Sequence, residues 1–178
     1  MAREYYTLTN NNIIKGGHIM LFIDTNTIPT TSPLHGKGYQ PLAFATSHSL
    51  QKTLNTTEVS TKDHGDSPAT LGQSISWQIT TDNLYSIQGY RTLNDVFNSM
   101  KPVKVAFGES SFDNSGQASI VAAQGATSYS YNWQPDNTGF YEEGMAVIQS
   151  LQVTAGAGDN ATYSATLQGS GTIDVHGS

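Results

Sequence analysis

Apolar and polar residues alternate along most of this chain, and a period of two is the pattern of β-strands. The alternation is most regular in residues 73–85, where Ile75, Trp77 and Ile79 fall on the face expected to be buried. Further strands are expected at residues 18–25, 40–54, 103–107, 142–155 and 161–173, with residues 56–61 continuing the second of these beyond a bend.

The same alternation predicts which side chains of each strand share a face. In residues 40–54 these are Leu42, Phe44, Thr46, His48 and Leu50. In residues 142–155 they are Met145, Val147, Leu151 and Val153, and in residues 161–173 they are Tyr163, Ala165 and Leu167. We expect His48 to lie at a sheet margin with its hydrogen bonds satisfied.

One helix is expected, at residues 91–100. Leu93, Val96, Phe97 and Met100 follow one another at helical spacing and form a single apolar stripe. Lys101-Pro102 ends the helix, because the residue before a proline disfavours helical geometry.

Glycine, proline and short polar residues mark the connections between these elements. Loops are expected at residues 27–38 and 62–72, and a hairpin turn at residues 156–160. Residues 109–140 show no clear period. Residues 1–17 are polar, so we expect an N-terminal arm followed by a single β domain at residues 18–178. About seven strands and one helix, without βαβ alternation, predict a mainly β fold, an antiparallel β-sandwich or barrel with one flanking α-helix.

Composition adds two constraints. Only 37% of the 178 residues are hydrophobic, which suggests either many half-exposed strands or a fold that gains burial by assembling. The net charge is −6, and residues 105–178 carry seven carboxylates with no lysine or arginine. A protein that grips DNA needs clustered cations, so the charge pattern argues against a DNA-binding protein.

The candidate chemistry is sparse. There is no cysteine, and no nucleophile elbow, phosphate loop or dinucleotide fingerprint, so no catalytic residue and no cofactor are expected. Asp63, His64 and Asp66 could meet on a metal ion, but three donors are fewer than calcium or zinc usually takes, so we expect a turn and no metal. Glu142 and Glu143 point to opposite faces of a strand, which rules out a paired acid and base, and we expect a solvated strand start.

Two separated segments carry a resemblance. Residues 59–66 read Val-Ser-Thr-Lys-Asp-His-Gly-Asp and precede the alternating strand that contains Trp77. Residues 161–171 read Ala-Thr-Tyr-Ser-Ala-Thr-Leu-Gln-Gly-Ser-Gly. In this order, with an early Lys15-Gly16 and one short helix between them, the segments resemble the major tail protein, or tail tube protein, family of long-tailed bacteriophages.

The resemblance implies a tail-tube-like fold and a structural, non-enzymatic virion protein, made in the host bacterial cytoplasm and located in the tail. Six copies would form a ring, and rings would stack into a tube around a tape measure protein, between tail tip and head-tail terminator proteins. DNA would pass through the lumen without specific binding. The resemblance also implies a subunit interface at Lys62, Asp63, Gly65 and Asp66.

Two alternatives stay open. One is the inner-tube protein of a contractile injection system, which shares the fold and the conduit function. The other is a carbohydrate-binding β-sandwich module, suggested by the aromatic residues Tyr129, Tyr131, Trp133 and Tyr141, which could stack on sugar rings.

Overall fold

The structure is a computed structural model that describes residues 16–42, 45–59, 69–112, 133–136 and 139–177. A short 3-10 turn, Gly16–His18, precedes β1 (Ile19–Asp24), β2 (Tyr39–Pro41), β3 (Ala45–Val59) and β4 (Ala69–Leu84). The helix α1 (Ile87–Ser99) follows, and then β5 (Val103–Phe112), β6 (Trp133–Pro135), β7 (Tyr141–Thr154) and β8 (Thr162–His176).

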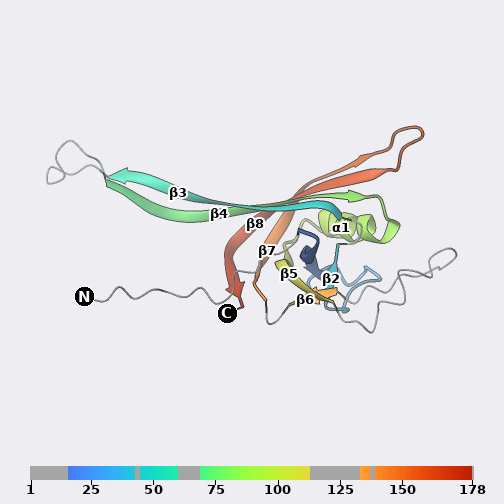
Figure 1. Ribbon diagram of the computed structural model, residues 1–178, viewed down its shortest axis with the longest axis horizontal. Coiled ribbons are helices and arrows are strands. Elements are labelled where there is room, and N and C mark those ends of the chain that lie inside the picture. The colour runs from blue at the N-terminus through green and yellow to red at the C-terminus, as the bar shows by residue number, and fades with distance from the viewer. Residues whose placement is uncertain (1–15, 43–44, 60–68, 113–132, 137–138, 178) are drawn as a thin grey trace, which may run out of the picture.

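The described strands form one antiparallel sheet in the order β2-β1-β5-β7-β8-β4-β3, with β6 paired to β5 beside this path. The expected mainly β, antiparallel fold with one flanking helix is confirmed, and its strands follow one continuous path. In Figure 1, β3 and β4 extend as a long hairpin away from the body, while α1 lies against the sheet near the opposite end of that hairpin.

Residues 40–54, expected as one strand, belong to two strands, β2 and β3, which lie at opposite edges of the sheet. β2 pairs with β1 through Phe22↔Pro41, whereas β3 pairs with β4 along almost its whole length. Residues 56–59 continue β3, as expected, and the register with β4 shifts between Asn55 and Thr56. A continuous polar-apolar alternation cannot reveal such a crossover, because both strands keep the period of two.

The helix begins four residues earlier than predicted. Ser86 caps its N-terminus, since the Gly89 N–H donates to the Ser86 hydroxyl oxygen at 3.1 Å. The buried stripe is Gly89, Thr92, Leu93 and Val96. The prediction for Phe97 and Met100 was wrong: Phe97 is 41% exposed, and Met100 lies beyond the helix in the left-handed region, 86% exposed.

The core lies on one face of the sheet beneath α1. Its buried residues come from β1, β4, α1, β5, β7 and β8 and from the segments after β1 and β2, among them Leu21, Ile28, Ile79, Leu93 and Leu167. The inward positions predicted for Tyr163, Ala165 and Leu167 are confirmed, as is that of Trp77. The prediction for β7 was out of phase. Ala146 and Ile148 are buried instead of Met145 and Val147, and a register shift between Ile148 and Ser150 then returns Leu151 to the core.

Trp77 explains the glycines of the late motif. Its ring lies where a Cβ at Gly169 would stand, and a Cβ at Gly144 would approach a ring carbon to 2.7 Å. The Trp77 indole N–H donates to the carbonyl oxygen of Gly171 at 3.0 Å. Gly171 itself has φ +88°, a conformation that favours glycine. The Gly-Ser-Gly segment and the distant tryptophan are therefore one packing unit.

Candidate assembly surface

The hairpin of β3 and β4 is the most unusual feature of the surface. Only residues 78–84 of β4 pair with β8, so the preceding residues of β4 pair with β3 alone among the described strands. We call this projecting part, residues 53–59 and 69–76, the arm. It is separate from the N-terminal arm expected at residues 1–17. β-branched Thr53, Thr56 and Thr57 favour extended backbone here, although the arm has no core of its own.

The arm continues the core face of the sheet into solvent. Successive cross-strand pairs on that face are Leu50↔Ile79, Lys52↔Trp77 and Leu54↔Ile75. Ile79 is fully buried, but Leu54 is 58% and Ile75 is 61% exposed. The inward prediction for Ile75 was therefore wrong within a single copy. We call Leu54 and Ile75 the arm patch; an exposed apolar pair on an open strand edge is a typical docking surface.

A second apolar area lies at the other end of β4. Leu84 and Tyr85 are 38% and 41% exposed, and Ile87 at the start of α1 is 78% exposed. The Tyr85 ring packs against Tyr90 with centroids 5.2 Å apart. We call Leu84, Tyr85 and Ile87 the junction patch. Sixteen residues of strand put it roughly 50 Å from the far end of the arm, at about 3.3 Å per residue.

On β3, β4 and the first half of β8, the face of the sheet opposite the core is mostly polar and carries little charge, although Leu84, the partner of Thr162, also lies on it. On β3, β4 and β8 it presents Ser47, Ser49, Gln51, Thr53, Asn55, Ser74, Ser76, Gln78, Thr80, Asp82, Thr162, Ser164, Thr166 and Gln168. Asp82 is the one ionisable side chain in this set, which we call the polar face. Ser49 and Thr80 share a 2.6 Å hydrogen bond, and the Gln78 amide donates to Gln149 at 3.3 Å.

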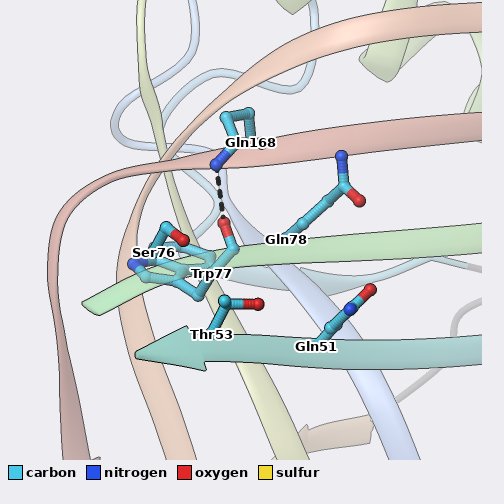
Figure 2. A pocket seen from close by; sticks show the side chains of 6 residues that line it. All are labelled: Gln51, Thr53, Ser76, Trp77, Gln78 and Gln168. Carbon is cyan, nitrogen blue, oxygen red and sulfur yellow. Dashed lines mark hydrogen bonds between the residues drawn. The ribbon is translucent and has the colours of Figure 1, made fainter. Parts of the chain in front are cut away.

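A shallow hollow of about 160 Å³ lies on this face where β4 separates from β8. Figure 2 shows Gln51, Gln78 and Gln168 around it, with the Gln168 amide donating to the Trp77 carbonyl oxygen at 3.0 Å. Amides and hydroxyls can donate or accept hydrogen bonds with many partners, but they hold no net charge with which to grip a phosphate.

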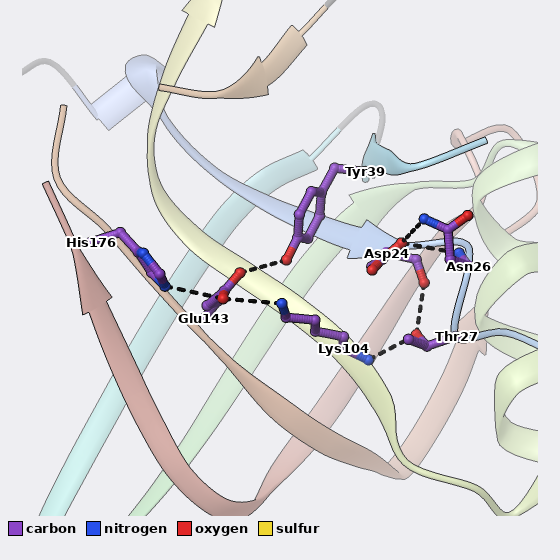
Figure 3. A network of polar contacts seen from close by, with 7 residues as sticks. All are labelled: Asp24, Asn26, Thr27, Tyr39, Lys104, Glu143 and His176. Carbon is purple, nitrogen blue, oxygen red and sulfur yellow. Dashed lines mark hydrogen bonds and ion pairs between the residues drawn. The ribbon is translucent and has the colours of Figure 1, made fainter. Parts of the chain in front are cut away.

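Charged groups gather elsewhere, at the edge of the body formed by β2, β5, β7 and the end of β8. Figure 3 shows Glu143 receiving the Tyr39 hydroxyl at 2.7 Å and facing the Lys104 ammonium and the His176 ring at 3.0 Å each. Burial opposes ionisation of Glu143, but hydrogen bonds from Tyr39 and Lys104 and the charge of Lys104 outweigh it, so its pKa is lowered. Burial and the same carboxylate raise the pKa of Tyr39.

Lys104 also links this cluster to the turn after β1. The Lys104 backbone N–H donates to the Thr27 hydroxyl at 2.9 Å, and Asn26 donates to the Asp24 carboxylate through both its backbone and its side-chain nitrogen (Figure 3). The cluster thus joins strands of the body to one another, and it lies away from the arm.

Glu142 and Glu143 point to opposite faces, as predicted, but neither is a solvated strand start. The Glu142 side chain is only 5% exposed and forms an ion pair with Lys52 of β3, while Glu143 is 15% exposed in the cluster of Figure 3. Sequence reasoning missed Lys52, a lone cation on the core face of an otherwise apolar and hydroxyl-rich stretch. That isolated charge was the available signal that a buried partner exists.

His48 lies at a sheet margin, as predicted, because β3 is an edge strand, but the prediction that its hydrogen bonds are satisfied was wrong. It faces the core side of β3, and neither ring nitrogen has a hydrogen-bond partner. Burial lowers the pKa of His48 to about 4, with the Asp82 charge acting in the opposite direction.

The sequence-predicted interface residues Lys62, Asp63, Gly65 and Asp66 lie outside the described residues, as does His64 of the metal hypothesis. Within the described ranges, no group of three or more acidic, His or Cys side chains could hold a metal ion. Tyr129 and Tyr131 also lie outside them, and Tyr141 stacks on His176 with centroids 4.8 Å apart. None of the helices that the structure describes is long and apolar enough to cross a membrane.

No protein-family model matches the chain, and no curated protein matches it. Three solved structures share its fold at a TM-score of 0.61 each. A chain from the virion of a native gene transfer agent particle is 12% identical in sequence, and the match covers 92% of this chain and 98% of that one. The tail of an empty gene transfer agent particle, refined with C6 symmetry, is 15% identical, with 91% and 98% covered.

The tail tube of SPP1 is 11% identical, with 93% of this chain and 80% of that chain covered. The chain therefore has the fold of subunits found in phage-type tails. More particularly, it is the fold of the subunit that builds the SPP1 tail tube, and the expected tail-tube-like architecture is confirmed.

Proposed function

We propose that this chain is a structural subunit of a tail tube, in which six copies form a ring and the rings stack into a conduit for DNA ejection. The observation that carries the proposal is the arm: an edge strand of 15 residues and an apolar patch that one copy leaves in water. A chain of this fold gains burial only when another copy covers that surface. The sixfold symmetry of the gene transfer agent tail supports six copies per ring.

The two apolar patches support a head-to-tail ring contact. The arm patch and the junction patch lie at opposite ends of β4, so the arm patch of one copy can cover the junction patch of its neighbour. Contacts between two different patches are heterologous, and they close a ring when the rotation between copies is right. Lys62, Asp63, Gly65 and Asp66 connect the two strands of the arm in sequence, so this interface would include them.

We assign the polar face to the bore. Of residues 105–178, β8 contributes Thr162, Ser164, Thr166 and Gln168 to this face, so that part of the wall consists of hydroxyls and amides. Glu142 and Glu143 are engaged in ion pairs, and Asp82 is the one ionisable side chain among the residues that define the polar face. Such a wall does not attract phosphates, and it offers passing proteins little apolar surface apart from Leu84 at its end.

Assembly is tested directly by concentrating the purified protein and examining it by negative-stain electron microscopy and light scattering. Hollow tubes of stacked rings with six subunits each are the expected product. A chain that stays monomeric at high concentration, and after addition of preformed tail tips, would contradict the proposal.

The bore assignment has a separate test, which the absence of cysteine makes simple. Gln78→Cys lies on the polar face and Asn98→Cys on the exposed side of α1. In assembled tubes, a bulky poly(ethylene glycol) maleimide should label Asn98→Cys but not Gln78→Cys, whereas a small maleimide should label both. Both reagents should label both positions in the monomer. Equal labelling of Gln78→Cys by the bulky reagent in tubes and monomers would place the polar face outside.

The proposal gives the chain a role in which no bond is made or broken, so it is not an enzyme. The tape measure, tail tip and terminator proteins stay predictions from the resemblance, as does location in the virion tail.

A further inference from the structure

The arm leaves the sheet at one cross-strand pair, Lys52↔Trp77. The next pair toward the body, Gln51↔Gln78, is the last at which β4 is also paired with β8, through Gln78↔Gln168. Beyond Lys52↔Trp77 the two arm strands pair only with each other among the described residues. A two-stranded ribbon of this length twists and bends easily, so its direction is set where it is attached.

Three contacts converge on that one pair. The Gln168 side-chain amide donates to the Trp77 carbonyl oxygen at 3.0 Å, which holds the backbone of β4 to β8 (Figure 2). The Trp77 indole donates to the Gly171 carbonyl oxygen at 3.0 Å. On the partner strand, the Lys52 ammonium forms an ion pair with Glu142 of β7, whose side chain is 5% exposed.

These contacts reach two different strands of the body from the two strands of the arm. β3 is tied to β7 through Lys52, and β4 is tied to β8 through Trp77. Two attachment points on separate strands restrain a ribbon against rotation as well as tilt, which one point cannot do. Gly144 and Gly169 give the Trp77 ring the space to lie flat against β7 and β8.

We propose that Lys52, Trp77, Glu142 and Gly171 form a clamp that fixes the direction of the arm before assembly, and that this direction sets how readily copies join. Only the effect on how readily copies join rests on the proposed function. A pre-oriented arm has less freedom to lose on docking, so binding is stronger for the same contacts. Because Glu142 is nearly buried, Lys52 is the partner that keeps its charge compatible with the core.

The first experiment measures the arm in the monomer. Nitroxide labels at Thr57→Cys on the arm and Asn98→Cys on α1, both exposed and in a chain without other cysteines, report the arm-to-body distance by electron spin resonance. The clamp-free variant is Lys52→Gln/Trp77→Phe/Glu142→Gln, which removes the ion pair and the indole donor and keeps an aromatic ring. Its matched control is Lys104→Gln/Glu143→Gln, which removes an ion pair of 3.0 Å in the body.

We expect a narrow distance distribution in the unaltered chain and in the control, and a clearly broader one in the clamp-free variant. If the triple variant does not fold, Trp77→Phe alone provides the comparison, with a smaller broadening. A distribution as narrow without the clamp as with it would overturn the inference.

The second experiment measures the critical concentration for tube formation. If the docking direction is populated about one tenth of the time without the clamp, that concentration rises about tenfold. An unchanged value in a variant with a broadened arm would overturn the link to assembly. If no version polymerises while the arm still broadens, the proposed function fails and the clamp stands.

Discussion

At the scale of single residues, space beside Trp77 determines what positions 144 and 169 tolerate. Gly169→Ala would push a methyl group into the indole ring, and the neighbouring strand backbone leaves the ring little room to move. Overpacking of this kind costs typically about 1–3 kcal/mol. Chemical denaturation should show this loss, whereas the control Gly16→Ala, with nothing within 4 Å of the new methyl group, should stay within about 0.5 kcal/mol of the parent.

Trp77 and Phe97 provide a direct comparison between a buried and a half-exposed aromatic residue. Trp77 is 2% exposed, so Trp77→Ala should cost about 3–5 kcal/mol, as for large core residues. Phe97 is 41% exposed, and Phe97→Ala should cost only about 1 kcal/mol, near the centre of the range for point mutants. Thermal unfolding of the two variants side by side measures the difference. Equal losses would mean that the helix stripe runs through Phe97 after all.

His48 makes stability depend on pH. Its pKa falls from 6.5 in the unfolded chain to about 4 in the fold, because burial disfavours the imidazolium. Between these two pKa values the unfolded state binds a proton at His48 and the folded state does not. The stability that depends on neutral His48 is therefore complete above pH 6.5 and is lost as the pH falls toward 4. The loss is at most about 3 kcal/mol. Denaturation curves measure the free energy of unfolding at each pH. Between pH 7 and pH 4 this free energy should fall by about 3 kcal/mol more in the parent than in His48→Leu.

At the scale of elements, the sequence predicted well where the strands lie along the chain, but it predicted poorly which strands pair with each other. The period of two located the extended segments, and the Gly-rich turn before β8 identified a hairpin. Nothing in that period distinguishes Trp77 from Ile75, since both alternate correctly and only the separation of β4 from β8 decides which is covered. A single bulge near Ile148 likewise reversed the phase of β7. Ion pairs such as Lys52 with Glu142 join residues 90 positions apart, beyond the reach of any local pattern.

The arm patch should act on assembly with little effect on the fold. Leu54→Thr/Ile75→Thr places β-branched threonine, which suits a strand, at both positions and removes apolar surface that the single copy leaves exposed. We expect a melting temperature close to that of the parent and a marked loss of tubes by sedimentation. The matched control, Asn55→Ser/Ser74→Thr, alters the polar face of the same stretch. Tubes lost in the control as well would point to a general weakness of the hairpin.

At the scale of the whole molecule, the distribution of charge matters more than the net value of −6. Cations are few, and those at Lys52 and Lys104 are engaged by buried or half-buried carboxylates. Asp82 is the one ionisable side chain among the residues that define the polar face, which we assign to the bore. Charge thus stabilises contacts within the body, and the surface offered to a passing polymer consists mainly of uncharged hydrogen-bonding groups.

This arrangement predicts no measurable binding of duplex DNA, even at low salt. DNA carries one negative charge per roughly 1.7 Å of axis, and a protein holds it by releasing counterions with clustered lysine and arginine, which the polar face lacks. Fluorescence anisotropy at about 0.02 M salt, where the screening length is roughly 20 Å instead of the roughly 8 Å of physiological salt, gives an electrostatic grip its best chance. The matched variant Gln51→Lys/Gln78→Lys places two cations on facing positions of β3 and β4. Assembled into tubes, it should gain DNA binding that weakens as salt is added, because each ring would then present twelve new cations if it holds six copies. Salt-sensitive binding by the unaltered protein would instead reveal a cationic surface and contradict a bore through which DNA passes freely.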